Sequence, residues 1–245
     1  MAVYLKKFET QAAYEAAQSG LILPNVSLIV DNNTVHYNPI DPYNGHDYVE
    51  IGGLKWATMN VGANSITDGG LYFQWGDTQG YTSSQVGSGT GQKYFGWADY
   101  KYCSGAGTSS SAMTKYNSTD SKTVLEVSDD AARANWGGKW RIPTVAEYAA
   151  LCNAVNTAWA QVNGVYGLQC TDKTDSSKVL FFPACGLCRN GSVDYVGSNG
   201  YCWSSSLDSS GVHGAYFLVF YDGGVYWQRN SLRCNGFPVR GVVGE

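Results

Sequence analysis

The clearest alternation of hydrophobic positions lies in the last fifth of the chain, between residues 215 and 229. Two runs rich in aromatic and β-branched residues flank Asp222-Gly223-Gly224, and Asp-Gly is a strong signal for a two-residue turn. Successive side chains of a strand point to opposite faces. The pattern therefore predicts a β-hairpin. One face carries Tyr216, Leu218, Phe220, Val225 and Trp227, and the other carries Phe217, Val219, Tyr221 and Tyr226.

Both faces of this hairpin are apolar, whereas a half-buried hairpin has polar residues on one face. Two interpretations follow. The hairpin is buried on both sides, or its second face is an exposed aromatic patch of the kind that marks binding surfaces. The alternation alone leaves both open.

The remaining pattern mixes short strands, short helices and long polar connections, and so predicts an α+β fold. Thr144 and Glu147 form a capping box at the start of a helix whose buried face would include Tyr148, Leu151 and Cys152. Residues 77–125 are rich in Gly, Ser, Thr and Tyr and predict a long surface excursion. Near the N-terminus we further expect a helix over Thr10 to Ser19 and strands over Asn25 to Val30 and Thr34 to Tyr37. Further along the chain we expect a hairpin over Asp47 to Val61, a helix over Ala131 to Asn135 and a strand over Lys178 to Phe182.

Chain breakers predict the division into domains. Pro39, Pro42 and Gly45 follow the two N-terminal strands closely. We therefore expect an N-terminal helix and hairpin unit over residues 1–45 and a main domain over residues 46–245. The N-terminal unit is either a leader for assembly or a subdomain that packs on the rest.

Composition excludes several classes of protein. Only 15% of the residues are charged, 14% are aromatic, and the 30 glycines indicate a loop-rich fold. A formal net charge of -4 gives no electrostatic reason to bind nucleic acid or anionic membranes. No stretch approaches the roughly 18 apolar residues of a membrane span, and the first residues lack a secretory hydrophobic region. We expect neither membrane insertion nor a signal peptide.

Candidate catalytic and metal-binding chemistry is weak. Cys185 and Cys188 have the spacing of a zinc ligand pair, but a structural zinc site needs a second close pair, and Cys202 and Cys234 are far apart. With seven cysteines and no signal peptide, free thiols are the simpler interpretation. The three histidines are isolated, and no Ser/His/Asp arrangement can be argued. We therefore predict no metal, no cofactor and no enzymatic activity.

The stretch from Cys185 to Arg240 has an unusual composition. It contains no Lys, Glu, Met, Ile or Thr, although the chain has ten lysines, all at or before Lys178. The residues present instead are nearly all types that codons ending in a pyrimidine can encode. Codons ending in a pyrimidine cannot encode Trp or Gln, and these two residue types occur in the stretch only as Trp203, Trp227 and Gln228.

This stretch resembles the variable region of target proteins of diversity-generating retroelements. The resemblance rests on Gly200 to Leu207, the hairpin, Asn235 to Arg240, and Trp136 to Pro143. It covers roughly residues 46–245. It implies a C-type lectin fold of the formylglycine-generating-enzyme type, encoded by a gut bacteriophage or prophage, with a variable region at about 185–240. The retained scaffold would include Trp203, Tyr216, Leu218, Phe220, Trp227 and Arg240.

The resemblance also implies a function and a site. The protein would be a display protein on a virion surface, phage receptor-binding or adhesin-like, with an N-terminal unit that attaches to other virion proteins. Its partner would be a protein or glycan receptor on a bacterial cell surface, and homo-oligomer formation stays open. The implied variable, ligand-binding residues are Tyr195, Tyr201, Asp208, His213, Phe217, Val219, Tyr221, Asp222, Tyr226, Arg229, Asn230 and Leu232.

Two other functions remain as alternatives. The first is an enzyme of the formylglycine-generating type. Such enzymes oxidise a target cysteine with a pair of cysteines near their C-terminus, but Cys234 has no partner close in sequence. Calcium-dependent lectins carry Glu-Pro-Asn or Gln-Pro-Asp with Trp-Asn-Asp, and none of these motifs occurs. A calcium-independent glycan-binding protein or a purely structural virion protein is therefore the second alternative.

Overall fold

The computed structural model describes residues 26–31, 34–39, 43–104 and 112–244. The chain divides into two compact units, Met1–Gly45 and His46–Glu245. This division falls where the chain breakers predicted it. In the first unit, β1 (Val26–Asp31) pairs antiparallel with β2 (Thr34–Pro39), so the predicted N-terminal hairpin is confirmed. The helix predicted over residues 10–19 lies outside the described residues.

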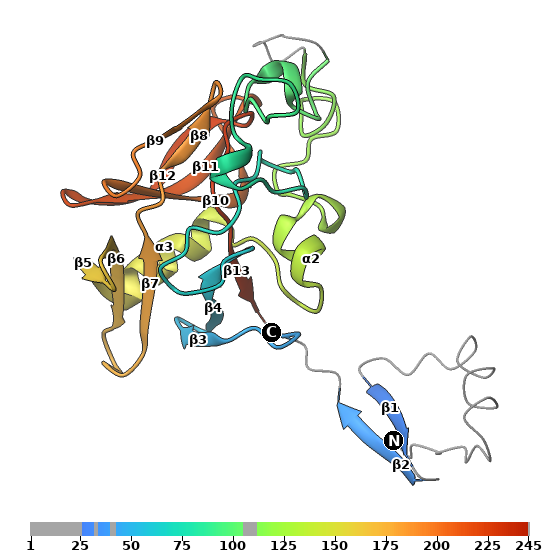
Figure 1. The fold of residues 1–245 in the computed structure, drawn as a ribbon, viewed down its shortest axis with the longest axis vertical. Coiled ribbons are helices and arrows are strands. Elements are labelled where there is room, and N and C mark those ends of the chain that lie inside the picture. The colour runs from blue at the N-terminus through green and yellow to red at the C-terminus, as the bar shows by residue number, and fades with distance from the viewer. Residues whose placement is uncertain (1–25, 32–33, 40–42, 105–111, 245) are drawn as a thin grey trace. The chain divides into compact units, whose positions relative to one another are not determined.

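The second unit is α+β, and its strands pair antiparallel throughout the described sheets (Figure 1). Three sheets have three strands each, in the orders β13-β4-β3, β5-β6-β7 and β10-β11-β12, and β8 pairs with β9. The bounds are β3 Tyr48–Ile51, β4 Leu54–Asn60, β5 Val155–Val162, β6 Val165–Asp172, β7 Val179–Pro183, β8 Leu187–Arg189, β9 Ser192–Asp194, β10 Asn199–Leu207, β11 Gly214–Tyr221, β12 Gly224–Leu232 and β13 Arg240–Val243.

The two α-helices among the described residues each begin at a side-chain cap. In α2 (Ala131–Trp136), the Asp130 carboxylate accepts a hydrogen bond from the Arg133 amide at 3.0 Å. In α3 (Val145–Ala154), the Thr144 hydroxyl accepts from the Glu147 amide, and the Glu147 carboxylate accepts from the Thr144 amide at 2.8 Å. The predicted capping box is thus confirmed.

The main core lies where α3 packs against β10, β11 and β12. Its buried side chains come from α3, β3, β4, β5, β6, β7, β10, β11 and β13. In Figure 1, α3 lies between the β5-β6-β7 sheet and the β10-β11-β12 sheet. Cys152 is only half-buried, although it packs against this core as the helix pattern predicted.

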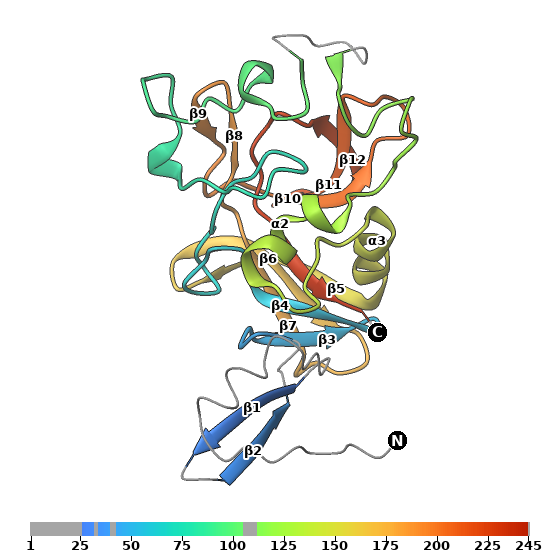
Figure 2. The ribbon, with the colours of Figure 1, turned by 90° about the vertical axis from the view of Figure 1, so that its right-hand side faces the viewer.

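The described part of residues 77–125 is anchored by buried side chains, unlike the long surface loop that the sequence predicted. They contain the short 3-10 helices η2 (Ser83–Gln85) and η3 (Trp97–Asp99), and η5 (Val127–Asp129) follows them. Phe95, Tyr100 and Tyr116 within them are almost fully buried. Figures 1 and 2 both show this segment, in teal and green, at the end of the unit that carries β8 to β12. The prediction of a mere surface loop is therefore wrong.

Candidate ligand-binding surface on the β10-β11-β12 sheet

The register of this sheet defines two rows of side chains on its outer face. Tyr201 on β10 pairs with Val219 on β11, which pairs with Tyr226 on β12. Two residues back along β11, Phe217 pairs with Arg229. Phe217 and Val219 are two residues apart on β11, whereas their partners Arg229 and Tyr226 are three residues apart on β12. The extra residue on β12 is a β-bulge. The bulge brings Arg229 to the same face as Tyr226.

The inner face of the hairpin belongs to the core. Leu218 and Phe220 are fully buried in it, while Val225 and Trp227 are partly buried and pack against it. Among the predicted scaffold residues, Trp203, Leu218, Phe220 and Arg240 are buried, and Tyr216 and Trp227 are half-buried.

Arg240 shows how a scaffold cation is held without a carboxylate. Its guanidinium donates to Asn60 Oδ1 at 2.9 Å, to the Ala57 carbonyl at 2.8 Å and to the Phe181 carbonyl at 2.9 Å. It also lies over the Phe182 ring. Burial lowers the pKa of Arg240, but these acceptors satisfy the charged group.

The outer face is covered over its β10 side. The Phe237 ring stacks on Trp203 at a centroid distance of 4.1 Å and lies 5.0 Å from Phe217 and 5.2 Å from Tyr201. Phe217 is consequently only 7% exposed and Val219 only 8%. The prediction that these two side chains lie on an exposed face is therefore wrong. For β11, burial on both faces is the correct interpretation.

Two further predicted surface residues are also buried. Tyr201 lies under Phe237, and the Asp208 carboxylate accepts hydrogen bonds from the Ser210 amide at 3.0 Å and hydroxyl at 2.8 Å. The expectation of exposure is wrong for both, because Phe237 covers Tyr201 and the Asp208 carboxylate is held by the neighbouring Ser210.

Beyond Phe237 the outer face is open. Tyr221 and Tyr226 are each 37% exposed, their rings stack at 6.0 Å, and their hydroxyls lie 3.5 Å apart. The Arg229 guanidinium lies 5.2 Å from the centre of the Tyr226 ring. These three residues are called the tyrosine-arginine corner below. Residues 225–229 line a hollow of about 470 Å³ beside it. The remaining exposed predicted residues in this part are His213, Asp222, Asn230 and Leu232.

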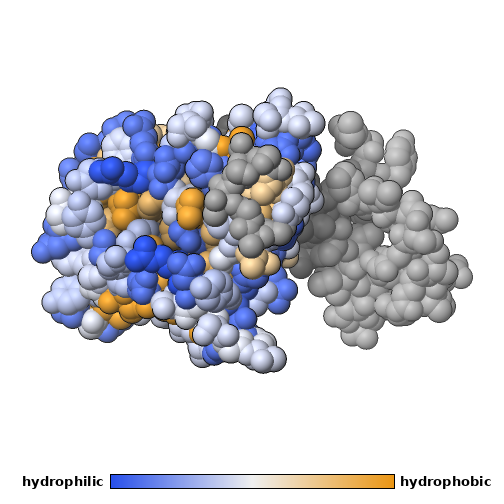
Figure 3. Space-filling model, turned by 90° about the horizontal axis from the view of Figure 1, so that it is seen from above, coloured by the Kyte–Doolittle hydropathy of each residue, from blue (hydrophilic) through white to orange (hydrophobic). Residues whose placement is uncertain are grey.

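Tyr195 forms a second exposed aromatic position, on the β10 side of the covered centre. Its ring lies 6.5 Å from Tyr201. The Arg189 guanidinium lies 5.6 Å from the Tyr195 ring and pairs with Asp194 at 2.8 Å. The predicted site residues therefore fall into two exposed groups separated by a buried aromatic cluster. Figure 3 looks onto the end of the second unit that carries β8 to β12. Its hydrophobic residues form separate orange patches between hydrophilic blue ones.

Sequence reasoning missed Arg233, which supports the end of β12. Its buried guanidinium donates to the Tyr100 hydroxyl at 2.9 Å and to the carbonyls of Lys115, Tyr116 and Val212 at 2.7–3.1 Å. It also contacts the rings of Trp75, Tyr100 and Tyr116. Arg233 thus connects the hairpin to Tyr100, Lys115 and Tyr116. No pattern in the sequence marks it, because its partners are mostly backbone carbonyls far away in the chain.

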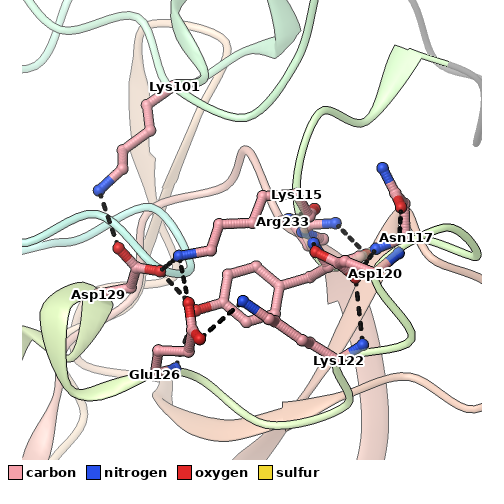
Figure 4. A network of polar contacts seen from close by, with 9 residues as sticks. Lys101, Lys115, Asn117, Asp120, Lys122, Glu126, Asp129 and Arg233 are labelled. Atoms are coloured by element: carbon pink, nitrogen blue, oxygen red, sulfur yellow. Dashed lines mark hydrogen bonds and ion pairs between the residues drawn. The ribbon is translucent and has the colours of Figure 1, made fainter.

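A polar network lies next to Arg233 (Figure 4). Lys115 Nζ contacts both Asp129 and Glu126, and Lys122 Nζ lies 2.6 Å from Glu126. Burial alone would raise the pKa of Asp129, but hydrogen bonds from Lys115, Tyr102 and Tyr116 outweigh it and bring that pKa to about 2. The network satisfies its own charges, so it stabilises the fold and offers no free group to a ligand.

Six of the seven thiols are chemically quiet, because burial raises the pKa of each. Burial raises the pKa of Cys152 to about 11, that of Cys202 to about 12 and, with the charges of Asp99 and Cys103, that of Cys234 to about 12. These thiols stay protonated at neutral pH and are poor nucleophiles. Cys103, distant in sequence, is thus close enough to influence Cys234. None of the seven cysteines, all of which lie among the described residues, forms a disulfide bond.

Neither a metal centre nor a membrane span is found in the described part of the chain. No three His, Cys, Asp or Glu side chains there are grouped to hold a metal ion. No helix there has the length and apolarity needed to cross a membrane.

Comparison of the chain with protein-family models, with curated proteins and with solved structures gave no match.

Proposed function

We propose that this protein is a ligand-binding display protein whose surface residues are diversified by a retroelement, on a C-type lectin scaffold. It would act as a phage receptor-binding or adhesin-like protein at a virion surface. The ligand would be a protein or glycan receptor on a bacterial cell. Residues 1–45 would serve assembly with other virion proteins. No enzymatic activity and no cofactor are part of this proposal.

The observation that carries the proposal is the division of one hairpin into a buried strand and an exposed strand. β11 is buried on both faces except at Tyr216, which is half-buried, and Tyr221, which is exposed. On β12, in contrast, the exposed residues include Tyr226, Gln228, Arg229 and Asn230. Side chains of β12 can therefore change while β11 keeps register and stability. The exposed residues include Tyr and Arg, which supply much of the binding energy at protein surfaces.

The composition between Cys185 and Arg240 supports diversification in particular. The absence of Lys, Glu, Met, Ile and Thr over this stretch has no structural reason, since exposed β12 positions would tolerate all five residues. A mutational process confined to codons that end in a pyrimidine gives a direct explanation for the absence of Lys, Glu and Met, because no such codon encodes these three residues.

The experiment that tests the proposal is sequencing of the DNA on both sides of the gene. The proposal expects a reverse transcriptase gene and a near-copy of the codons for residues 185–240 whose differences fall at adenines of the copy. If neither element is found within the same phage or prophage, diversification by a retroelement is rejected.

A further inference from the structure

Arg229 is an exposed cation without a carboxylate partner among residues 43–104 and 112–244. Arg141 and Arg189, in contrast, are paired with Glu147 and Asp194. Arg229 lies over the Tyr226 ring and lines the hollow of about 470 Å³. An unpaired guanidinium at the edge of a hollow is suited to an anionic group, which it can bind through two parallel N–H···O bonds.

Tyrosine hydroxyls add donors beside this cation. The hydroxyls of Tyr221 and Tyr226 lie 3.5 Å apart, so one O–H at most can lie between them and the other can donate outward. The contact with Tyr226 raises the pKa of Tyr221, while the nearby charge of Arg229 lowers it. Guanidinium and phenol groups thus share one exposed corner that is rich in donors.

The charge distribution makes this corner specific. The chain has a formal net charge of -4, so a polyanion is repelled by the molecule as a whole and attracted only locally. Between residues 185 and 240 the other arginines are Arg189, which is paired, and Arg233 and Arg240, which are buried. One free guanidinium fits a ligand whose charges are separated by neutral units, not an acidic peptide with adjacent carboxylates.

We propose that the tyrosine-arginine corner binds a carboxylate or phosphate group of an acidic polysaccharide, with Arg229 as the residue that recognises the charge. This inference rests on the proposed function, because it names the ligand class of the same surface. The planar side chains of Tyr226, Gln228 and Arg229 along one strand supply donors and acceptors that suit the hydroxyl groups of neighbouring sugar rings.

The test measures binding of the full chain to two matched pairs of polymers. Hyaluronate, whose carboxylate-bearing sugars alternate with neutral ones, is compared with its methyl ester, and phosphomannan with dephosphorylated mannan, so that the two pairs separate a carboxylate from a phosphate. At least one acidic polymer should bind about 10-fold or more tightly than its neutral counterpart. That preference should weaken as salt rises, because the corner is exposed to solvent.

Variants assign the preference to Arg229. Arg229→Gln should abolish it, whereas Arg229→Lys, which keeps the charge, should retain part of it. Lys139→Gln removes an exposed cation outside this sheet and should leave the preference unchanged. Equal binding of acidic and neutral polymers, or an acidic preference that survives Arg229→Gln, overturns the inference.

The outcomes separate this inference from the proposed function. If only neutral polymers bind and Tyr221→Ser with Tyr226→Ser removes that binding, the surface is a binding surface but its ligand is not acidic. If no polymer binds, the acidic-polysaccharide inference is rejected, and the flanking DNA still decides the proposed function independently.

Discussion

Phe217 and Tyr221 occupy the same face of one strand but have different environments. Phe217 is covered by Phe237, which comes from a segment about twenty residues further along the chain. Tyr221 lies near the turn, beyond that cover, and is 37% exposed. Alternation along the strand cannot reveal such a difference, because it records which way a side chain points and not what lies above it. The stability of single variants should follow exposure.

Phe220→Ala should lower the free energy of unfolding by about 3–5 kcal/mol, because it leaves a cavity in a fully packed core. Phe217→Ala should also be clearly destabilising, although its face was first expected to be exposed. Trp227→Ala should cost less than Phe220→Ala, since Trp227 is half-buried.

Tyr221→Ser and Tyr226→Ser are the matched surface variants. Each should change stability by no more than about 0.5 kcal/mol, as surface substitutions usually do. Urea denaturation of all five variants provides the measurement. Losses at the two tyrosines as large as the loss for Phe220→Ala would mean that β12 belongs to the core.

Asp129 makes stability depend on pH. Its pKa in the folded protein is about 2, below the roughly 3.9 of an unfolded aspartate. A lowered folded pKa stabilises the protein above the unfolded value, and the contribution is lost as pH falls from about 4 to about 2. The contribution at pH 7 should be at most about 3 kcal/mol.

Asp129→Asn removes this contribution. Unfolding free energies of wild type and variant should therefore differ most at neutral pH and converge near pH 2. A difference that stays constant between pH 7 and pH 2 would show that the carboxylate charge is not the stabilising feature.

At the scale of elements, the sequence predicted those with a local signal. The Asp222-Gly223 turn and the Thr144 capping box each determine their element within a few residues, and both lie where expected. The β5-β6 hairpin was missed, although Asn163-Gly164 marks its turn, because β5 follows α3 without a break. The bulge in β12 was also missed, since it depends on pairing with β11 and not on residue types.

Arg233 connects the hairpin by hydrogen bonds to Tyr100, Lys115 and Tyr116, which lie far away in the chain. Arg233→Met keeps the length of the side chain but leaves the carbonyls of Lys115, Tyr116 and Val212 without this donor. Unpaired buried acceptors cost about 1–3 kcal/mol each, so we expect a loss of about 3 kcal/mol or more. Hydrogen exchange should accelerate at residues 113–117. Arg229→Met is the exposed control, and equal effects of the two variants would contradict this role.

At the scale of the whole molecule, exposure agrees with the sequence for eight of the twelve predicted ligand-binding residues. Tyr195, Tyr221, Tyr226 and Arg229 are exposed, as the resemblance implied. The remaining four of the twelve, Tyr201, Asp208, Phe217 and Val219, are buried, which residue types alone do not indicate. The division into two units was predictable, because Pro39, Pro42 and Gly45 are local breakers.

Residues 46–245 should fold without the N-terminal unit. The main cores draw on strands and helices between Tyr48 and Val243. A truncated chain that starts at His46 should unfold cooperatively, with a urea midpoint close to that of the full chain. An unfolded or markedly less stable truncation would show that residues 1–45 complete the core.

The central claim is that a fixed scaffold displays changeable residues on β12 and its surroundings. Sequencing codons 185–240 in many copies of this gene from one host population tests it most directly. The account predicts substitutions concentrated at Tyr195, Tyr221, Tyr226 and Arg229, with Trp203, Leu218 and Phe220 unchanged. Identical copies, or substitutions spread equally over exposed and buried positions, would contradict it.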